Sequence, residues 1–176
     1  MSVLAFVWGF AEGTVFFLLP DTLLTATALG SLRKALRQSC WALGGALLAG
    51  GLMFDFARRD PSAALSLVLR VPFVRAAMVD RADADFQRSG ALAVVSGPAR
   101  GIPYKMYAVR APENSVRVAP FLLASVPARF LRFLLMVALA RGVSGLLGPA
   151  RRRAAWVLWA TLWALGYGFY WTGVVL

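Results

Sequence analysis

The first apolar stretch, residues 3–29, constrains the fold most, because it is long enough to enter a bilayer and yet carries two acids. In one continuous helix, Glu12 and Asp21 would lie on opposite faces. One carboxylate would then face lipid, at a cost of roughly 2.5–3.5 kcal/mol. Pro20 removes a helical hydrogen bond and so allows the chain to break and turn back. Broken helices at membrane depth occur where they line a cavity or contact protein. We therefore predict a re-entrant hairpin over 3–29, broken at Pro20, with both acids facing inward.

The composition of the whole chain favours an integral membrane protein. It is 60% hydrophobic with a mean hydropathy of +0.68, whereas soluble domains are about 45–50% apolar. The formal net charge is +11. The basic residues are scattered between and within apolar runs, which argues against a nucleic-acid partner and favours contact with anionic phospholipid at the cytoplasmic leaflet. The 176 residues suit a single membrane domain, 1–176.

Several kinds of chemistry are excluded by residue usage. The chain has no histidine and a single cysteine, Cys40, so disulfides, clustered zinc ligands and histidine-based acid–base catalysis are ruled out. No nucleophile elbow, phosphate-binding loop or dinucleotide fingerprint is present. We therefore expect no enzyme, no metal and no cofactor. The N-terminus lacks a basic region before its apolar run, so we do not expect a cleavable signal peptide.

Three later runs have the length and apolarity of transmembrane helices: residues 39–57, 118–140 and 154–175. The first is rich in small residues, namely Gly44, Gly45, Gly50 and Gly51. Small residues let another backbone approach closely. The approaching helix could belong to the same chain or to a second copy in a homo-oligomer. The last run carries tryptophans near its start, which is typical of an interfacial aromatic belt.

Two further segments have distinct patterns. Residues 58–89 mix charges with apolar residues at helical spacing, which predicts amphipathic helices broken near Pro72, with the acids of 80–85 on a solvated face. Residues 90–112 are moderately apolar and are interrupted by Pro98, Gly101 and Pro103. Proline and glycine at this density end a regular helix. We predict a second re-entrant hairpin over 90–112, with Pro98 and Pro103 as helix breakers.

The distribution of basic loops is consistent with this arrangement. The loops 31–37 and 141–153 are rich in arginine and lysine and should face the cytoplasm. Both can do so only if residues 58–117 cross the membrane an even number of times. A re-entrant 90–112 satisfies this condition, and a simple span would not.

The charges at membrane depth form the candidate site. The first half contributes the acids Glu12 and Asp21, and the second half contributes four bases: Arg100, Lys105, Arg129 and Arg132. Opposite charges near helix-breaking prolines are typical of transporters built from paired broken helices. We expect Glu12 or Asp21 to pair with Arg100, and Arg129 or Arg132 to complete the cluster. Such acids could relay protons, or the bases could hold a lipid phosphate. The alternative is that these charged residues have no functional role: they form structural ion pairs, or the arginines extend to the lipid headgroups.

Four motifs in order resemble the DedA family, the bacterial branch of the SNARE-associated Golgi protein (VTT domain) superfamily. They are Glu12-Gly13 followed by Phe16-Phe17-Leu18-Leu19-Pro20-Asp21-Thr22-Leu23-Leu24, the glycine-rich 44–51, Pro98-Ala99-Arg100-Gly101-Ile102-Pro103-Tyr104-Lys105, and Phe121 and Ser125 followed by Arg129-Phe130-Leu131-Arg132-Phe133. The chain departs from the first motif, since the glycine of that family between Pro20 and Asp21 is absent. The resemblance covers roughly residues 10–140.

This resemblance implies two re-entrant hairpins that face each other in a bacterial inner membrane. It also implies a lipid scramblase or flippase, or a proton-coupled transporter. Glu12 and Asp21 would be the essential acids, and Arg100 and Lys105 or Arg129 the essential bases. Together with the patterns above, we expect an all-α integral membrane protein with two facing hairpins, about three transmembrane helices and an amphipathic segment. It would move lipids or small charged solutes through a charged mid-membrane site, with lipids and protons as partners. The alternative is a non-transporting scaffold that organises partner proteins or anionic lipids.

Overall fold

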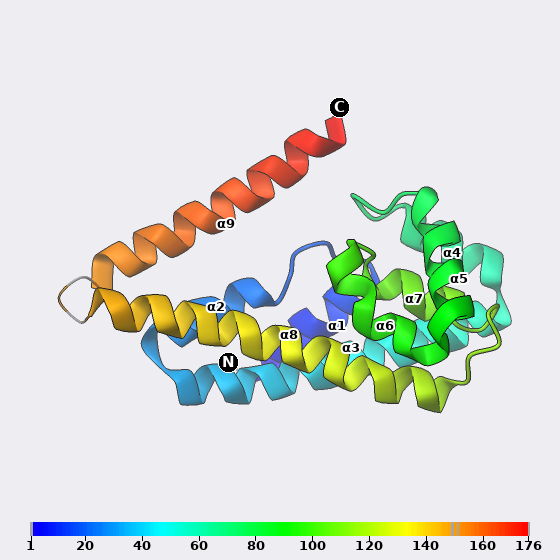
Figure 1. Cartoon of the computed structure of the whole chain (residues 1–176), viewed down its shortest axis with the longest axis horizontal. Coiled ribbons are helices and arrows are strands. Elements are labelled where there is room, and N and C mark those ends of the chain that lie inside the picture. Colours follow the sequence, from blue (N-terminus) through cyan, green and yellow to red (C-terminus); the bar gives the residue numbers. More distant parts are fainter. Residues whose placement is uncertain (1, 149, 151, 176) are drawn as a thin grey trace.

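The computed structural model describes residues 2–148, 150 and 152–175, and in these residues every regular element is a helix, with no strand. Figure 1 shows the arrangement. The elements are α1 (Ser2–Thr14), α2 (Asp21–Gly30), α3 (Leu32–Arg59), α4 (Pro61–Leu69), α5 (Ala77–Ser89), η1 (Gly90–Leu92), α6 (Ala93–Ser96), η2 (Gly97–Arg100), α7 (Tyr104–Arg110), α8 (Val118–Leu147) and α9 (Arg152–Val175). The all-helical prediction is confirmed.

Two helices, α3 and α8, are long and apolar enough to cross a membrane. They contact each other and run in opposite directions along the long axis of the molecule (Figure 1). Only 44% and 33% of their most apolar stretches are buried, so large apolar side chains point outward, Leu52 from α3 and Leu131 and Leu135 from α8. Both helices extend beyond the predicted spans. Helix α9, the third predicted span, is long enough to cross a bilayer, but among the described helices only α3 and α8 also reach the apolarity expected of a membrane span.

The first apolar stretch is broken where its proline predicts. Helix α1 ends at Thr14, and α2 begins at Asp21 with Pro20 as its N-cap. Between them the chain reverses direction (Figure 1). The indole N–H of Trp8 donates to the carbonyl oxygen of Leu18 at 3.1 Å and so holds this turn against α1. The break places Glu12 in the last turn of α1 and Asp21 at the first residue of α2, so both acids lie beside it.

The contact between α1 and α3 depends on glycine. A Cβ on Gly9 would lie 2.2 Å from the carbonyl oxygen of Ala42, and one on Gly45 would lie 2.0 Å from that of Phe6. Gly44 and Gly51 have ordinary room, with nearest atoms at 3.6 and 4.0 Å. Only part of the predicted small-residue face is therefore needed for close packing, and within it Gly45 serves this chain's own α1.

Residues 58–89 form α4 and α5, with a break that includes Pro72, as predicted. Asp60 caps α4, since its carboxylate accepts hydrogen bonds from the Ala63 backbone N–H and the Ser62 hydroxyl, both at 2.9 Å. The prediction of a solvated acidic face on α5 is wrong for Asp85, which is only 3% exposed. It is wrong for Asp83 as well, which is part-buried and receives hydrogen bonds from Arg110 and Asn114. These donors come from later in the chain, so the local pattern could not show them.

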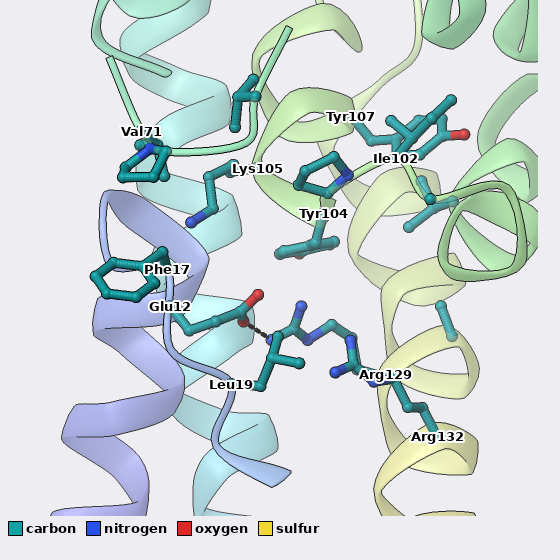
Figure 2. A pocket seen from close by; sticks show the side chains of 16 residues that line it. Glu12, Phe17, Leu19, Val71, Ile102, Tyr104, Lys105, Tyr107, Arg129 and Arg132 are labelled. Atoms are coloured by element: carbon teal, nitrogen blue, oxygen red, sulfur yellow. Dashed lines mark hydrogen bonds and ion pairs between the residues drawn. The ribbon is translucent and has the colours of Figure 1, made fainter. Parts of the chain in front are cut away.

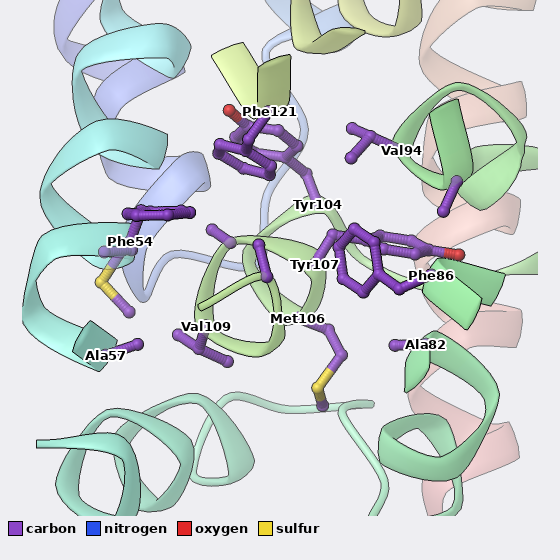
Figure 3. Close-up of a cluster of buried hydrophobic side chains, with 14 of the residues drawn as sticks. Phe54, Ala57, Ala82, Phe86, Val94, Tyr104, Met106, Tyr107, Val109 and Phe121 are labelled. Atoms are coloured by element: carbon purple, nitrogen blue, oxygen red, sulfur yellow. The ribbon is translucent and has the colours of Figure 1, made fainter. Parts of the chain in front are cut away.

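The second interrupted stretch packs into the largest apolar cluster. Residues 90–112 form η1, α6 and η2, then a break at 101–103, then α7. Figure 3 shows α7 side chains in the centre of this cluster, between α3, α5 and α8. The ring of Tyr107 meets that of Phe86 edge to face at 5.4 Å, and the ring of Tyr104 stacks on that of Phe121 at 5.6 Å. This core fixes the position of the second helix break.

Candidate functional site

A cavity of about 380 Å³ lies where the two helix breaks meet α8. Figure 2 shows its lining side chains. The polar ones are Glu12, Tyr104, Lys105, Tyr107, Arg129 and Arg132, and the two breaks contribute Phe17, Leu19, Gly101, Ile102 and Pro103. The two broken segments therefore meet at one cavity, together with the middle of α8, and charged side chains form part of its otherwise largely apolar wall.

The central contact of the site is an ion pair between Glu12 of α1 and Arg129 of α8 (Figure 2). Both residues are 5% exposed. The guanidinium also lies over the Tyr104 ring, with its central carbon 4.7 Å from the ring centroid, a geometry that favours a cation. The Nε of Arg129 is buried without a hydrogen-bond partner among the described residues. The arginine is thus neutralised by one carboxylate and keeps a donor unused.

A second ion pair joins Asp21 of α2 to Arg132 of α8. Arg132 lies one helical turn from Arg129, on the same side of α8. Asp21 is fully buried, whereas the Arg132 side chain is 29% exposed and lines the cavity. The Oδ1 atom of Asp21 has no hydrogen-bond partner in the described structure. Buried polar atoms of this kind are rare and call for an explanation.

Lys105 ties the two helix breaks together. It lies in the first turn of α7 and is 3% exposed. Its Nζ donates to the carbonyl oxygen of Phe16 at 2.7 Å. That oxygen lies in the loop between α1 and α2, where backbone carbonyls have no helical donor. With Glu12, Asp21, Arg129 and Arg132, Lys105 gives the site one more basic group than acidic groups.

Arg100 lies elsewhere. The expected pair between Arg100 and an acid of the first segment does not form, because Arg100 binds Asp85 of α5. Its side chain is half-exposed, and it does not line the cavity. The other oxygen of Asp85 accepts from the Tyr107 hydroxyl at 2.7 Å. Asp85 thus satisfies two donors of the second broken segment, which fixes that segment from outside the cavity.

Two of the three prolines predicted as helix breakers, Pro20 and Pro103, lie at breaks. Pro20 is the N-cap of α2, and Pro103 is the N-cap of α7 and lines the cavity. Pro98 falls within η2, at the end of α6. Because proline lacks a backbone N–H and clashes with a preceding helical turn, Pro20 and Pro103 are compatible with the start of a helix but not with its interior.

Tyr104 was not singled out from the sequence, although it lies between Pro103 and Lys105. Its ring stacks on that of Phe121, and the Arg129 guanidinium lies over the Tyr104 ring. It fits against α3 only because residue 50 is glycine, since a Cβ there would lie 2.0 Å from the Tyr104 hydroxyl oxygen. Its position next to a helix-breaking proline is the one signal that could have identified it.

The arrangement suits anion binding and proton exchange. Two guanidinium groups and an ammonium group surround two carboxylates in a largely buried space, and a proton or an anion that enters must alter one of the ion pairs. Among the described residues, no group of three or more His, Cys, Asp or Glu side chains could hold a metal ion.

Comparison with known proteins gives no match, whether to a protein-family model, a curated protein or a solved structure. What the chain does must therefore follow from its own residues.

Proposed function

We propose that this chain is a DedA-like multi-pass protein of the bacterial plasma membrane that moves lipids or small charged solutes through the cavity between its helix breaks. In this proposal the segments 3–29 and 90–112 are re-entrant hairpins that face each other. Helices α3 and α8 span the bilayer, and α9 is the third span. Protons exchanged at the acids drive or gate the movement.

The membrane placement is supported by the outward faces of the long helices. Most of the apolar length of α3 and α8 is not buried within the chain. In a soluble protein a helix this apolar would be a core helix, whereas a bilayer accepts the exposed leucines of both. Non-helical backbone at membrane depth needs a cavity or surrounding protein, and both breaks have one.

The observation that carries the transport proposal is the buried ion pair between Glu12 and Arg129, formed across the two halves of the chain. The pair borders the cavity, and Arg129 keeps an unused donor, its Nε. A protonated Glu12 would release Arg129 to bind an anionic group, and the pair would re-form when the anion leaves and Glu12 gives its proton back to water. Such competition couples proton and anion occupancy through one arginine.

Asp21 supplies a second candidate for proton binding. Only one of its oxygens is paired, with Arg132, although the side chain is fully buried. A proton on the other oxygen would remove the cost of a buried, half-satisfied carboxylate. Arg132 would then be free to contact a ligand in the cavity that it lines.

The scaffold alternative requires the glycines of α3 to be free for contact with a partner protein, and two of them are not. Gly45 accommodates α1, and Gly50 accommodates Tyr104, so these glycines serve internal packing. A scaffold would still be favoured if the protein moved nothing.

The test is lipid scrambling, and then solute uptake, in liposomes that hold the purified full-length protein, at two pH values. We expect Glu12→Gln to reduce transport at least about a hundredfold, the lower end of the effect expected when a group that acts in proton transfer is removed. The matched control is Glu113→Gln, because Glu113 is the chain's other glutamate and lies at the surface, paired with Arg110. Equal activity of wild type and Glu12→Gln would overturn the assigned site. No movement of lipid or solute by folded wild type would favour a scaffold.

A further inference from the structure

Three aromatic side chains of α9 reach the start of α2 with their polar atoms. Trp159, Trp163 and Tyr167 are four residues apart, so they lie along one face of the helix. The rings of Trp163 and Tyr167 stack, with their centroids 5.5 Å apart. We call these three side chains the aromatic ladder. Helix α9 contacts α2 as well as α8, and the aromatic ladder provides the hydrogen bonds of the contact with α2.

The Tyr167 hydroxyl lies at the break between α1 and α2. It accepts a hydrogen bond from the backbone N–H of Leu19 at 3.1 Å, and it lies 3.2 Å from the Thr22 hydroxyl, so that one of these two hydroxyls donates to the other. Leu19 belongs to neither helix, so its N–H has no acceptor within a helix. In the proposed membrane placement, water is not at hand to accept from such a group. A side chain of α9 therefore satisfies a backbone donor of the break.

The two tryptophans hold the first turn of α2. Their indole N–H groups both donate to the Thr25 hydroxyl, Trp159 at 2.9 Å and Trp163 at 3.1 Å. That hydroxyl donates in turn to the carbonyl oxygen of Asp21 at 2.6 Å. A hydroxyl has one donor and two acceptor sites, so all three are used. The aromatic ladder thus contacts α2 at the turn that begins with Asp21.

The segment held by the aromatic ladder carries two parts of the candidate site. Leu19 lines the cavity between the helix breaks, and Asp21 forms the ion pair with Arg132. The Asp21 side chain is fully buried, and its Oδ1 atom has no hydrogen-bond partner in the described structure. The contact with Arg132 therefore depends on where the first turn of α2 is held.

We infer that Tyr167 is a positioning residue for the candidate site. Its hydroxyl fixes the α1–α2 break so that Asp21 meets Arg132 in the geometry that transport requires, and in this respect the inference rests on the proposed function. Tyr167 is not among the described residues that line the cavity. It acts through the Leu19 N–H and the Thr22 hydroxyl, and not by contact with a ligand.

The first measurement is hydrogen exchange of the backbone amides of residues 15–22 in the purified full-length protein in detergent. Tyr167→Phe removes the hydroxyl and keeps the ring. The Leu19 amide should then exchange at least about tenfold faster, the factor that corresponds to one hydrogen bond of ordinary strength. The control is Thr27→Val, which removes a hydroxyl that donates within α2 and should leave the exchange of residues 15–22 unchanged.

The second measurement is transport in liposomes. Tyr167→Phe and Thr22→Val should each lower transport at least about tenfold in protein that remains folded, because small misplacements of a positioned group reduce rates strongly. Thr22→Ser keeps the hydroxyl beside Tyr167 and should transport like wild type. A merely structural role of Tyr167 would lower the melting temperature and leave the transport by folded protein unchanged.

Two results overturn the inference alone when wild type is active. One is unchanged exchange of the Leu19 amide in Tyr167→Phe, and the other is faster exchange with transport equal to that of wild type. Wild type that moves neither lipid nor solute overturns the proposed function, and the role of Tyr167 in transport with it.

Discussion

Glu12 and Arg129 neutralise each other's buried charge. Replacing both residues together therefore separates the contribution of the ion pair to stability from its role in transport. Arg129→Met alone leaves a buried carboxylate without its partner. We expect this to lower the free energy of unfolding by about 3–5 kcal/mol. Glu12→Leu with Arg129→Met replaces the pair by hydrocarbon and should recover most of that loss. Thermal unfolding in detergent measures both variants.

The double variant should still fail to transport, because neither the proton site nor the anion-binding arginine remains. A double variant that is stable and active would show that the pair is purely structural. One that is as unstable as Arg129→Met would contradict the assigned coupling between the two side chains.

At the residue scale, charged groups inside apolar runs were predictable, but their partners were not. Burying an acid is costly enough that Glu12 and Asp21 had to face protein, and Arg129 and Arg132 followed from the same logic. The pairing of Arg100 with Asp85 was missed because Asp85 lies among other charges on a segment whose pattern resembles a solvated face. Which acid is buried depends on contacts with α7, and these are set by tertiary packing.

At the scale of single helices, Gly45 and Gly51 provide a matched pair on α3. A methyl group at Gly45 would meet the Phe6 carbonyl oxygen at 2.0 Å, while one at Gly51 meets only a Leu122 methyl group at 4.0 Å. Gly45→Ala should therefore force α1 away from α3 and cost about 1–3 kcal/mol. Gly51→Ala should stabilise the helix by about 0.5–1 kcal/mol. Melting temperatures of the two variants in one detergent give the comparison, and equal values would contradict the close α1–α3 contact.

The start of α4 should respond to pH through Asp60. Hydrogen bonds from the Ala63 N–H, and from the Ser62 hydroxyl and backbone, hold the pKa of this carboxyl below its ordinary value of 3.8. The cap therefore stabilises α4 fully above that ordinary value, and its contribution is lost as the pH falls through the lowered pKa. Hydrogen exchange of the first amides of α4 should accelerate over this range in wild type. Asp60→Asn, which can still cap the helix, should remove this pH dependence. If the pH profile of exchange is the same in Asp60→Asn as in wild type, Asp60 is not the titrating group.

The helix breaks show how far element-scale prediction reaches. Proline and glycine mark where helices end, so the breaks near Pro20, Pro72 and Pro103 could be located from the sequence. The spatial relation between two breaks cannot be read in this way, because it depends on α8 and on the core around Tyr107. The close α1–α3 contact could be predicted only in part from the sequence. The glycines of α3 predicted a close neighbour, but the matching Gly9 gave no signal of its own beside the more prominent acids.

For the whole molecule, the α2–α3 turn, the end of α8 and the start of α9 lie at one end, while the end of α3 and the start of α8 lie at the other (Figure 1). The first end carries the basic stretch 31–37 together with Arg141 and Arg153, and by the positive-inside tendency it should face the cytoplasm. A Cys40→Ser background with single cysteines at Arg33, Arg117 or Arg153 tests this with a membrane-impermeant thiol reagent. Residues 33 and 153 should react in inverted vesicles and residue 117 in intact cells, because in the proposed placement α3 and α8 each cross the bilayer once between these ends. Reaction of residues 33 and 117 from the same side would show that neither helix spans, and the exposed leucines of α3 and α8 would then need a protein partner instead of lipid.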